Sequence, residues 1–389
     1  MIPTTAEILA ALPWIVFAIL VPILLRPRSN IEGYAPLEAV ASPMVSIIIP
    51  ARNEAENITT CLRTILKTRY PSWEIIVIDD NSVDGTAEIV RAIDESSGGR
   101  VTLVEGAPLP EDWMGKSWAC WQGYKAAKGD VLLFTDADTR HNTRLLGHAV
   151  AGMKKEKADL LTVLPRQIME GFWERIILPH VFVAIMLRFH DVTRIGKARK
   201  PRDVIANGQF LMFPRESYEA IGGHEAVRRN VVEDLRLAQI IVEKKRHVFA
   251  AHAEDMMETR MYRSLPGIVE GWSKNLALGA RQAAPKWLGP IAPWVLGVME
   301  ILFWVVPATV FVLSFFMTVS PFLSGWSLTA TVVSLVFWMV THVRFRIPML
   351  HATLYPMGAM ITGFMCFRSA MRGERVAWKG RNYPGVKPD

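Results

Sequence analysis

The stretch Val45-Ser-Ile-Ile-Ile-Pro-Ala-Arg-Asn-Glu54 joins a short β-branched run, stopped by a proline, to a polar loop. Such a run predicts a buried strand, and the helical spacing of apolar residues over Asn57–Thr68 predicts a helix after it. The pattern repeats with a strand at Glu74–Ile78 and a helix at Thr86–Ile93. Alternating helices and continuously apolar strands predict an α/β domain whose parallel sheet is covered on both faces.

Further strands continue this pattern. Val101–Val104 precedes a Pro-rich loop and a predicted helix at Ser117–Ala127, and Val131–Phe134 leads into the acidic triplet Asp136-Ala137-Asp138. The later run Asn207–Phe213 predicts another strand. Because ligands bind beyond the carboxyl ends of strands in such sheets, we expect the polar residues that follow these strands to share one site.

The acidic triplet is the first candidate ligand site. Acidic pairs in loops are commonly just solvated, but this one directly follows a predicted buried strand and lies in line with Asp79-Asp80. Two carboxylates suit Mg²⁺ or Mn²⁺ and leave coordination positions for a diphosphate. We predict that Asp138 binds the metal and that Asp136 either shares it or lies nearer the ribose of a nucleotide.

The residues that we expect to contact the nucleotide follow the first two strands. They are Pro50, Ala51, Arg52, Glu54 and Asp80. Residues 50–52 are expected to form the floor of the site, Glu54 to contact ribose or base, and Asp80 to accept hydrogen bonds. The alternative for Asp79-Asp80 is an ordinary capping turn, and we expect one of the two aspartates to have that role.

Lys116 lies near the start of the helix that begins at about Ser117. Backbone N–H groups at a helix N-terminus attract phosphate, so Lys116 is a candidate phosphate contact. A lysine at this position is equally typical of a plain surface.

Glu233-Asp234 opens a helical segment after Gly222-Gly223-His224. An acceptor hydroxyl needs a base to take its proton, a contribution of roughly 10²–10⁴ in rate. We predict that Asp234 is this base and that Glu233 and Gly223 lie on the acceptor and diphosphate side. The alternative is that the acidic pair only stabilises the helix N-terminus.

Trp272 and Lys274 stand just before the last apolar stretches. Their aromatic and basic character suits an acceptor channel or a diphosphate clasp, although packing against lipid would favour the same composition. The segment Ile168–Val192 predicts an interfacial helical stretch interrupted at Pro179.

Hydropathy separates the ends of the chain from its middle. The uncharged run Ile8–Leu25 ends at Arg26-Pro27-Arg28 and is long enough to span a bilayer. We interpret it as an uncleaved anchor, because a signal peptide would have positive charge before the run and a cleavage site after it. Three more apolar stretches follow at 293–319, 327–343 and 348–367.

These observations predict four regions. They are an N-terminal membrane anchor (1–28), a cytoplasmic α/β domain (43–286), two to three membrane segments (287–367) and a basic cytoplasmic tail (368–389). The arginines after the anchor place the domain in the cytoplasm. Three full crossings would put the tail outside, so one apolar segment is expected to be re-entrant or interfacial.

The 389-residue chain has 44 basic and 37 acidic residues, a net charge of +7. Much of the excess lies in 188–202 and 368–387, which carry no nucleic-acid fold signature, and this favours anionic lipid headgroups over nucleic acid. A merely solvated basic face is the alternative for the first patch. The three cysteines, odd in number and widely spaced, suit a reducing compartment and argue against disulfides.

The ordered set Val45–Glu54, Val77–Asp84, Asp136–Asp138 and Glu233–Asp234 resembles the family 2 glycosyltransferases, whose common fold is called GT-A. The resemblance covers about 45–275. It implies a Rossmann-like, mostly parallel sheet with helices on both faces, joined here to N-terminal and C-terminal transmembrane helices. It also implies a nucleoside-diphosphate sugar donor of the UDP-glucose type and a single inverting displacement, with Asp80 at the nucleotide, Asp138 at the metal and Asp234 as the base.

Within the family, three stretches look like the bacterial-type membrane enzymes that glycosylate carotenoids, hopanoids and related lipids. They are Trp113–Ala119, Gly271–Asn275 and Trp378–Tyr383. The Gln-x-x-Arg-Trp motif of processive synthases is absent from the sequence, so the resemblance implies transfer of one hexose to a membrane lipid at the inner or plasma membrane.

Two other functions stay open. One is sugar transfer to a polyprenyl phosphate carrier, and the other is a non-catalytic membrane scaffold that kept the fold. A nucleotidylyltransferase would need a Gly-rich, basic loop after the first strand, and Ala51-Arg52-Asn53-Glu54 is not such a loop.

Overall fold

The computed structural model describes residue 5 and residues 29–36, 42–189, 192–372, 376–378 and 381–383. The predicted anchor at Ile8–Leu25 lies outside the described residues. The chain divides into two compact units. The sheet unit includes Arg28–Ile168 and Asp191–Met261, and the helical unit includes Met169–His190 and Tyr262–Gly373. The unit boundary thus falls inside the predicted domain 43–286.

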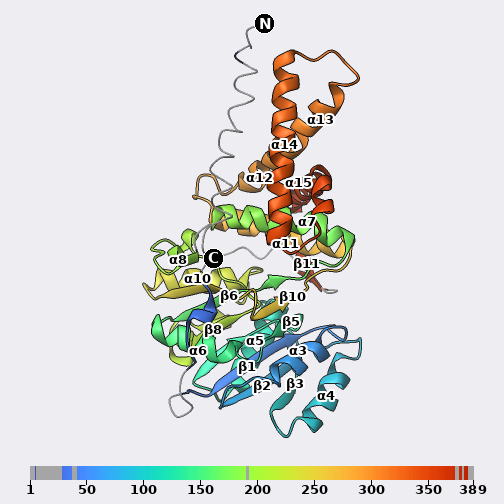
Figure 1. Ribbon diagram of the computed structural model, residues 1–389. Coiled ribbons are helices and arrows are strands. Elements are labelled where there is room, and N and C mark those ends of the chain that lie inside the picture. Colours follow the sequence, from blue (N-terminus) through green and yellow to red (C-terminus); the bar gives the residue numbers. More distant parts are fainter. Residues whose placement is uncertain are drawn as a thin grey trace. The chain divides into compact units, whose positions relative to one another are not determined.

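The described part of the sheet unit has a seven-stranded main sheet in the order β3-β2-β1-β4-β8-β6-β9 (Figure 1). Its strands are β1 (Val45–Ala51), β2 (Trp73–Asp79), β3 (Val101–Glu105), β4 (Val131–Phe134), β6 (Leu160–Leu164), β8 (Leu211–Pro214) and β9 (Val248–His252). β1 is parallel to β2 and β4, β2 to β3, and β6 to β9. β8 is antiparallel to both of its neighbours. The predicted mostly parallel sheet is confirmed.

Helices cover both faces of this sheet because side chains alternate along each strand. In β1, Ile47 and Ile49 pack into one core, and Ile48 packs into the core on the opposite face. Side chains of α3 (Ile58–Ile65), α4 (Thr86–Ser96) and α6 (Leu145–Lys155) join the first core, and those of α5 (Gly115–Ala126) and α10 (Glu233–Glu243) join the second. The two cores hold the strand ends, and hence the loops that follow them, at fixed positions.

A small second sheet follows the acidic triplet directly. Its strands are β5 (Thr139–His141), β10 (Met257–Thr259) and β7 (Arg166–Gln167), with β10 in the middle. Thr259 pairs with Thr139 on one side and with Gln167 on the other. Because Thr139 is adjacent to Asp138 in the chain, this sheet lies beside the loop that follows β4.

The remaining short elements of the sheet unit are connectors. They are η2 (Ile31–Gly33), α8 (Val192–Ile195), η4 (Pro201–Asp203), α9 (Arg215–Ala220), η5 (Gly223–Val227) and the antiparallel pair β11 (Val376–Trp378) and β12 (Arg381–Tyr383). The predicted strand over 207–213 begins only at Leu211. Residues 207–210 form a turn instead, closed by a hydrogen bond from Phe210 N–H to the carbonyl of Asn207 at 3.0 Å.

The helical unit contains no strand among its described residues. Its elements are α7 (Phe172–Arg188), α11 (Leu265–Ala283), α12 (Ala292–Glu300), the π-turn η6 (Ile301–Val305), α13 (Val306–Leu313), α14 (Pro321–Arg344), η7 (Met349–Leu354) and α15 (Tyr355–Arg372). Helix α7 continues through Pro179. The predicted interruption there is wrong, because neighbouring side chains hold the surrounding turns: Ile177, Leu178 and Val181 are all buried.

Two helices of the described residues are long and apolar enough to cross a membrane. They are Ala292–Leu313, with mean hydropathy 2.2, and Pro321–Arg344, with mean hydropathy 1.6. In the most apolar 18-residue stretch of each helix, 17% of the first and 28% of the second is buried. Neither therefore resembles the core helix of a soluble domain. The third predicted stretch, 348–367, forms η7 and most of α15, and α15 buries residues such as Ala359 and Met365 against its neighbours.

Candidate active site

The sheet unit brings together most of the predicted site residues. Pro50 and Ala51 end β1, Arg52 and Glu54 follow it, and Asp80 follows β2. Lys116 lies in the first turn of α5, Asp136 and Asp138 follow β4, and Glu233 and Asp234 begin α10. Gly223 begins η5. Trp272 and Lys274 lie on α11 in the helical unit, and their role in the site stays a prediction.

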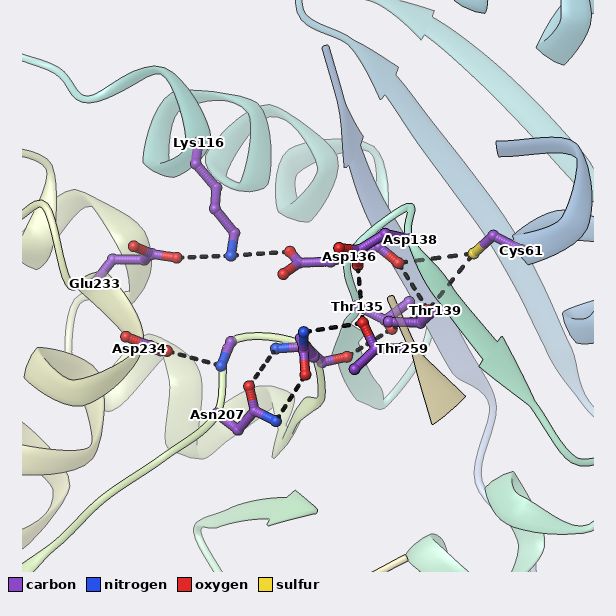
Figure 2. Close-up of polar contacts among 12 residues, drawn as sticks. Cys61, Lys116, Thr135, Asp136, Asp138, Thr139, Asn207, Glu233, Asp234 and Thr259 are labelled. Atoms are coloured by element: carbon purple, nitrogen blue, oxygen red, sulfur yellow. Dashed lines mark hydrogen bonds and ion pairs between the residues drawn. The ribbon is translucent and has the colours of Figure 1, made fainter. Parts of the chain in front are cut away.

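Lys116 lies between two carboxylates that are far apart in the sequence (Figure 2). Its Nζ is 2.9 Å from Asp136 Oδ1 and 2.9 Å from Glu233 Oε1. The Lys116 side chain is only 26% exposed, and the carboxylates of Asp136, Glu233 and Asp234 raise its pKa well above the ordinary value, outweighing the opposing effect of its burial. Lys116 is therefore fixed as a cation at the centre of an acidic group.

Asp234 is held by two backbone N–H groups. Gly208 N–H donates to Asp234 Oδ2 at 2.8 Å, and Leu235 N–H donates to Oδ1 at 2.7 Å. Burial, followed by the negative charge of Glu233, raises the pKa of Asp234 from 3.8 to about 6, although Lys116 and the two N–H groups oppose the rise. Asp234 is thus a carboxylate at neutral pH with a much greater proton affinity than a surface aspartate.

The acidic group exceeds the charge that Lys116 neutralises. One ammonium faces three carboxylates, those of Asp136, Glu233 and Asp234, and Asp138 lies two residues from Asp136 in the same loop. No three acidic, histidine or cysteine side chains in the described part of the chain come close enough to form a complete metal cage. Excess negative charge with at most two carboxylate ligands fits a Mg²⁺-type site that takes its other ligands from water and phosphate.

The loops after β1 and β2 support each other. Arg52 Nη1 donates to the carbonyl of Asp80 at 2.5 Å, and Asp80 N–H donates to the carbonyl of Ala51 at 2.8 Å. Asn53 and Asn81 take left-handed conformations, with φ of 51° and 56°, as asparagine tolerates in turns. Asp79 is the capping aspartate, because its Oδ2 accepts from Ser82 N–H at 3.1 Å. Asp80 is 3% exposed, and its role at the nucleotide stays a prediction.

Comparison with known proteins shows what the chain is similar to. Residues 46–222 match the model of the family described as Glycosyl transferase family 2. The chain is similar to this family over those residues, which make up somewhat less than half of its length. It is also 28% identical over 260 residues to 4,4'-diaponeurosporenoate glycosyltransferases of several Staphylococcus aureus strains. This alignment covers 65% of the chain and 66%, just under two thirds, of the length of those relatives.

The fold of the chain has a solved counterpart. The mannosyltransferase PcManGT of Pyrobaculum calidifontis, in complex with GDP-Man and Mn²⁺, superposes with a TM-score of 0.55 at 21% identity. The match covers 94% of this chain and 95% of that one. The predicted GT-A fold is confirmed.

Five residues of the domain's polar network were not among the predicted site residues. They are Thr135, Thr139, His141, Gln209 and Thr259, and each is less than a tenth exposed. The Thr135 and Thr139 hydroxyls lie 3.2 and 3.0 Å from His141 Nε2, and burial lowers the pKa of His141 to about 4, so this histidine is neutral. Thr135, Thr139 and His141 surround the acidic triplet in the sequence, whereas Gln209 and Thr259 lie far from it, and none of the five matches a motif. The one local signal was the polar pair Asn207 and Gln209, which flanks Gly208 inside an apolar run.

Gly223 has a packing role. Its φ is 52°, and a Cβ there would lie 2.4 Å from the Tyr218 ring. The Tyr218 hydroxyl in turn accepts from the backbone N–H of His224 at 2.9 Å. The geometry therefore explains a glycine at 223 without a ligand, and the place of Gly223 on the diphosphate side stays a prediction.

The backbone at Gly208 lies close to two charged side chains of the site. A Cβ at this residue would lie 3.0 Å from both Asp234 Oδ2 and Lys116 Nζ. We expect Gly208→Ala to displace these two groups by a few tenths of an ångström and to lower kcat on the order of tenfold, because misplaced catalytic groups lose rate steeply. Both displaced atoms are side-chain ends, so the melting temperature should change little. An unchanged kcat would show that the Gly208–Asp234 contact has no catalytic importance.

Proposed function

We propose that the chain is an inverting, metal-dependent glycosyltransferase that moves one sugar from a nucleoside diphosphate to the hydroxyl or carboxyl group of a membrane lipid. The observation that carries this proposal is the Lys116–Asp136–Glu233–Asp234 cluster at the carboxyl end of the sheet. It combines a buried base of raised pKa with a fixed cation and an excess of carboxylates, the groups that sugar transfer from a diphosphate requires.

Asp234 acts as the base. Each carboxylate oxygen has two lone pairs, and the N–H groups of Gly208 and Leu235 use one on each oxygen. A free lone pair takes the proton of the acceptor hydroxyl while the acceptor oxygen bonds to the anomeric carbon. The bond from that carbon to the diphosphate breaks with its electron pair on the leaving diphosphate, and the anomeric configuration inverts.

Lys116 has two tasks in this scheme. Without the donor it holds Asp136 and Glu233 in place. With the donor bound, a phosphate oxygen would replace one carboxylate as the partner of this ammonium, at the N-terminus of α5, where the helix dipole favours negative charge.

Asp138 and Asp136 are the proposed metal ligands. A bound Mg²⁺ or Mn²⁺ would stabilise the negative charge that develops on the departing diphosphate. Both ions belong in the tests, because the fold relative PcManGT is described with Mn²⁺.

The lipid acceptor is proposed from two observations. The Staphylococcus aureus relatives are named for transfer to 4,4'-diaponeurosporenoate, and the helical unit has two mostly unburied apolar helices. We propose that these helices cross the membrane and place the domain next to its acceptor, with the domain in the cytoplasm.

The function is tested by incubating membranes that contain the protein with labelled UDP-glucose or GDP-mannose and a lipid extract. Label in an organic-soluble, alkali-stable lipid glycoside is the expected product for a hydroxyl acceptor, and an alkali-labile ester is expected for a carboxyl acceptor. Label recovered instead as an acid-labile polyprenyl phosphate sugar would assign the carrier alternative. No transfer and no donor hydrolysis with either donor would favour the scaffold.

The pH profile tests the base directly. Because the base must be deprotonated, kcat/KM is expected to fall as the pH drops through about 6. Lys116 lowers the pKa of Asp234, so Lys116→Met should move the midpoint of this fall to higher pH. An unchanged midpoint in Lys116→Met would show that the group that titrates in the pH profile is not Asp234.

A further inference from the structure

The turn at residues 207–210 contacts Asp234 on one side and Thr135 and Thr259 on the other. Asn207 anchors it, because its N–H donates to Thr162 Oγ1 at 3.0 Å and its Oδ1 accepts from Gln209 N–H at 3.2 Å. Gly208 in the middle of the turn donates to Asp234. The turn is therefore a rigid support on the side of the proposed base.

Gln209 points its side chain the other way, toward the metal-binding loop. It is 3% exposed, and its Nε2 donates to Thr259 Oγ1 at 3.0 Å. Its Oε1 accepts from Asn207 Nδ2 at 3.1 Å and from Gln167 Nε2 at 3.4 Å. These two donors leave Nε2 as the only group of the amide that can face Thr259.

The Thr259 hydroxyl in turn donates a hydrogen bond to Asp138. Thr259 is fully buried in the middle strand of the small sheet, and its Oγ1 lies 3.4 Å from Asp138 Oδ1. A hydroxyl has one proton. Because Gln209 Nε2 can only donate, Thr259 accepts from it and keeps its own proton for the Asp138 carboxylate.

We propose that Gln209 and Thr259 are positioning residues that set the orientation of the Asp138 carboxylate for the divalent ion, so that one turn aligns the base and the metal ligand. This inference rests on the proposed function. Groups that orient a metal ligand through a hydrogen bond typically change metal affinity or activity by about 10–100-fold when they are removed. We therefore expect an effect of the same size when the Thr259 hydroxyl, which donates to Asp138, is removed.

The test is isothermal titration of Mn²⁺ into purified full-length protein with UDP, and separately with GDP, together with the Mn²⁺ dependence of transfer. We expect Thr259→Val, which keeps the shape and loses the hydroxyl, to weaken Mn²⁺ binding by about tenfold or more. Thr259→Ser should restore most of the affinity. Gln209→Met should give an intermediate loss, because the Thr259 hydroxyl can then rotate away. In transfer assays the half-activating Mn²⁺ concentration should rise, while saturating Mn²⁺ recovers most of kcat.

The matched control is Ser217→Ala, which removes a buried hydroxyl that donates to another carboxylate, Asp159, at 2.7 Å. It should lower the melting temperature without changing Mn²⁺ affinity. Wild-type Mn²⁺ affinity in Thr259→Val, or an equal loss of Mn²⁺ affinity in Ser217→Ala, would overturn this inference and leave the proposed function standing. If Thr259→Val does not fold, Gln209→Met decides, and wild-type affinity there overturns the inference. Failure of the wild-type protein to bind Mn²⁺ with either nucleotide would overturn the proposed metal site itself.

Discussion

Asp234→Asn is expected to lower kcat by roughly 10²–10⁴, the contribution of a positioned base. Asparagine has nearly the same shape but does not take a proton at neutral pH, and its amide group cannot accept from both Gly208 and Leu235. Donor affinity should hold or improve, because one negative charge leaves a group in which three carboxylates face one ammonium. Single-turnover transfer, measured beside donor binding, separates the two effects.

The control for this substitution lies on the same helix. Glu243→Gln, at the far end of α10, removes a carboxylate that pairs with Arg236 at 2.7 Å on the surface, and it should leave kcat unchanged. Transfer at the wild-type rate by Asp234→Asn would mean that another group, with Glu233 the nearest candidate, removes the proton.

Asp138→Asn should reduce transfer by about 10²–10³, the usual effect of losing one group that stabilises the charge of a transition state. The loss should be largest at low Mg²⁺ or Mn²⁺, and chelation of the wild-type protein should reproduce it. Asp136→Asn should differ, because it also removes one of the two partners of Lys116. Its pH profile is therefore expected to change along with its metal dependence.

Titration of activity with Mn²⁺ is the measurement that distinguishes these variants. A high Mn²⁺ concentration should partly restore Asp138→Asn, since one carboxylate and the diphosphate remain as ligands. Equal metal dependence in the wild-type protein and in Asp138→Asn would show that Asp138 is not a metal ligand. The assignment of Asp234 as the base would still stand.

The elements that were predicted closely are those marked by a run of consecutive apolar residues. The apolar runs at β1 and β4 match the predicted strands closely, since a buried parallel strand needs only a few consecutive β-branched or large apolar residues. The position of Asp136 and Asp138 after β4 follows from the same run. The turn at residues 207–210 was predicted as a strand because Phe210 and its successors are apolar, and the run gives no sign that Gly208 must face a carboxylate.

The strands, the acidic residues at their ends and a candidate base can therefore be predicted from local sequence. Which of these groups come into contact depends on the tertiary packing. Lys116 bridges Asp136 and Glu233 because α5 and α10 pack on one face of the sheet and β4 lies next to β8. Likewise Thr259 reaches Asp138 only through the small sheet. Such contacts depend on strand order and on the packing of distant segments, which no local periodicity encodes.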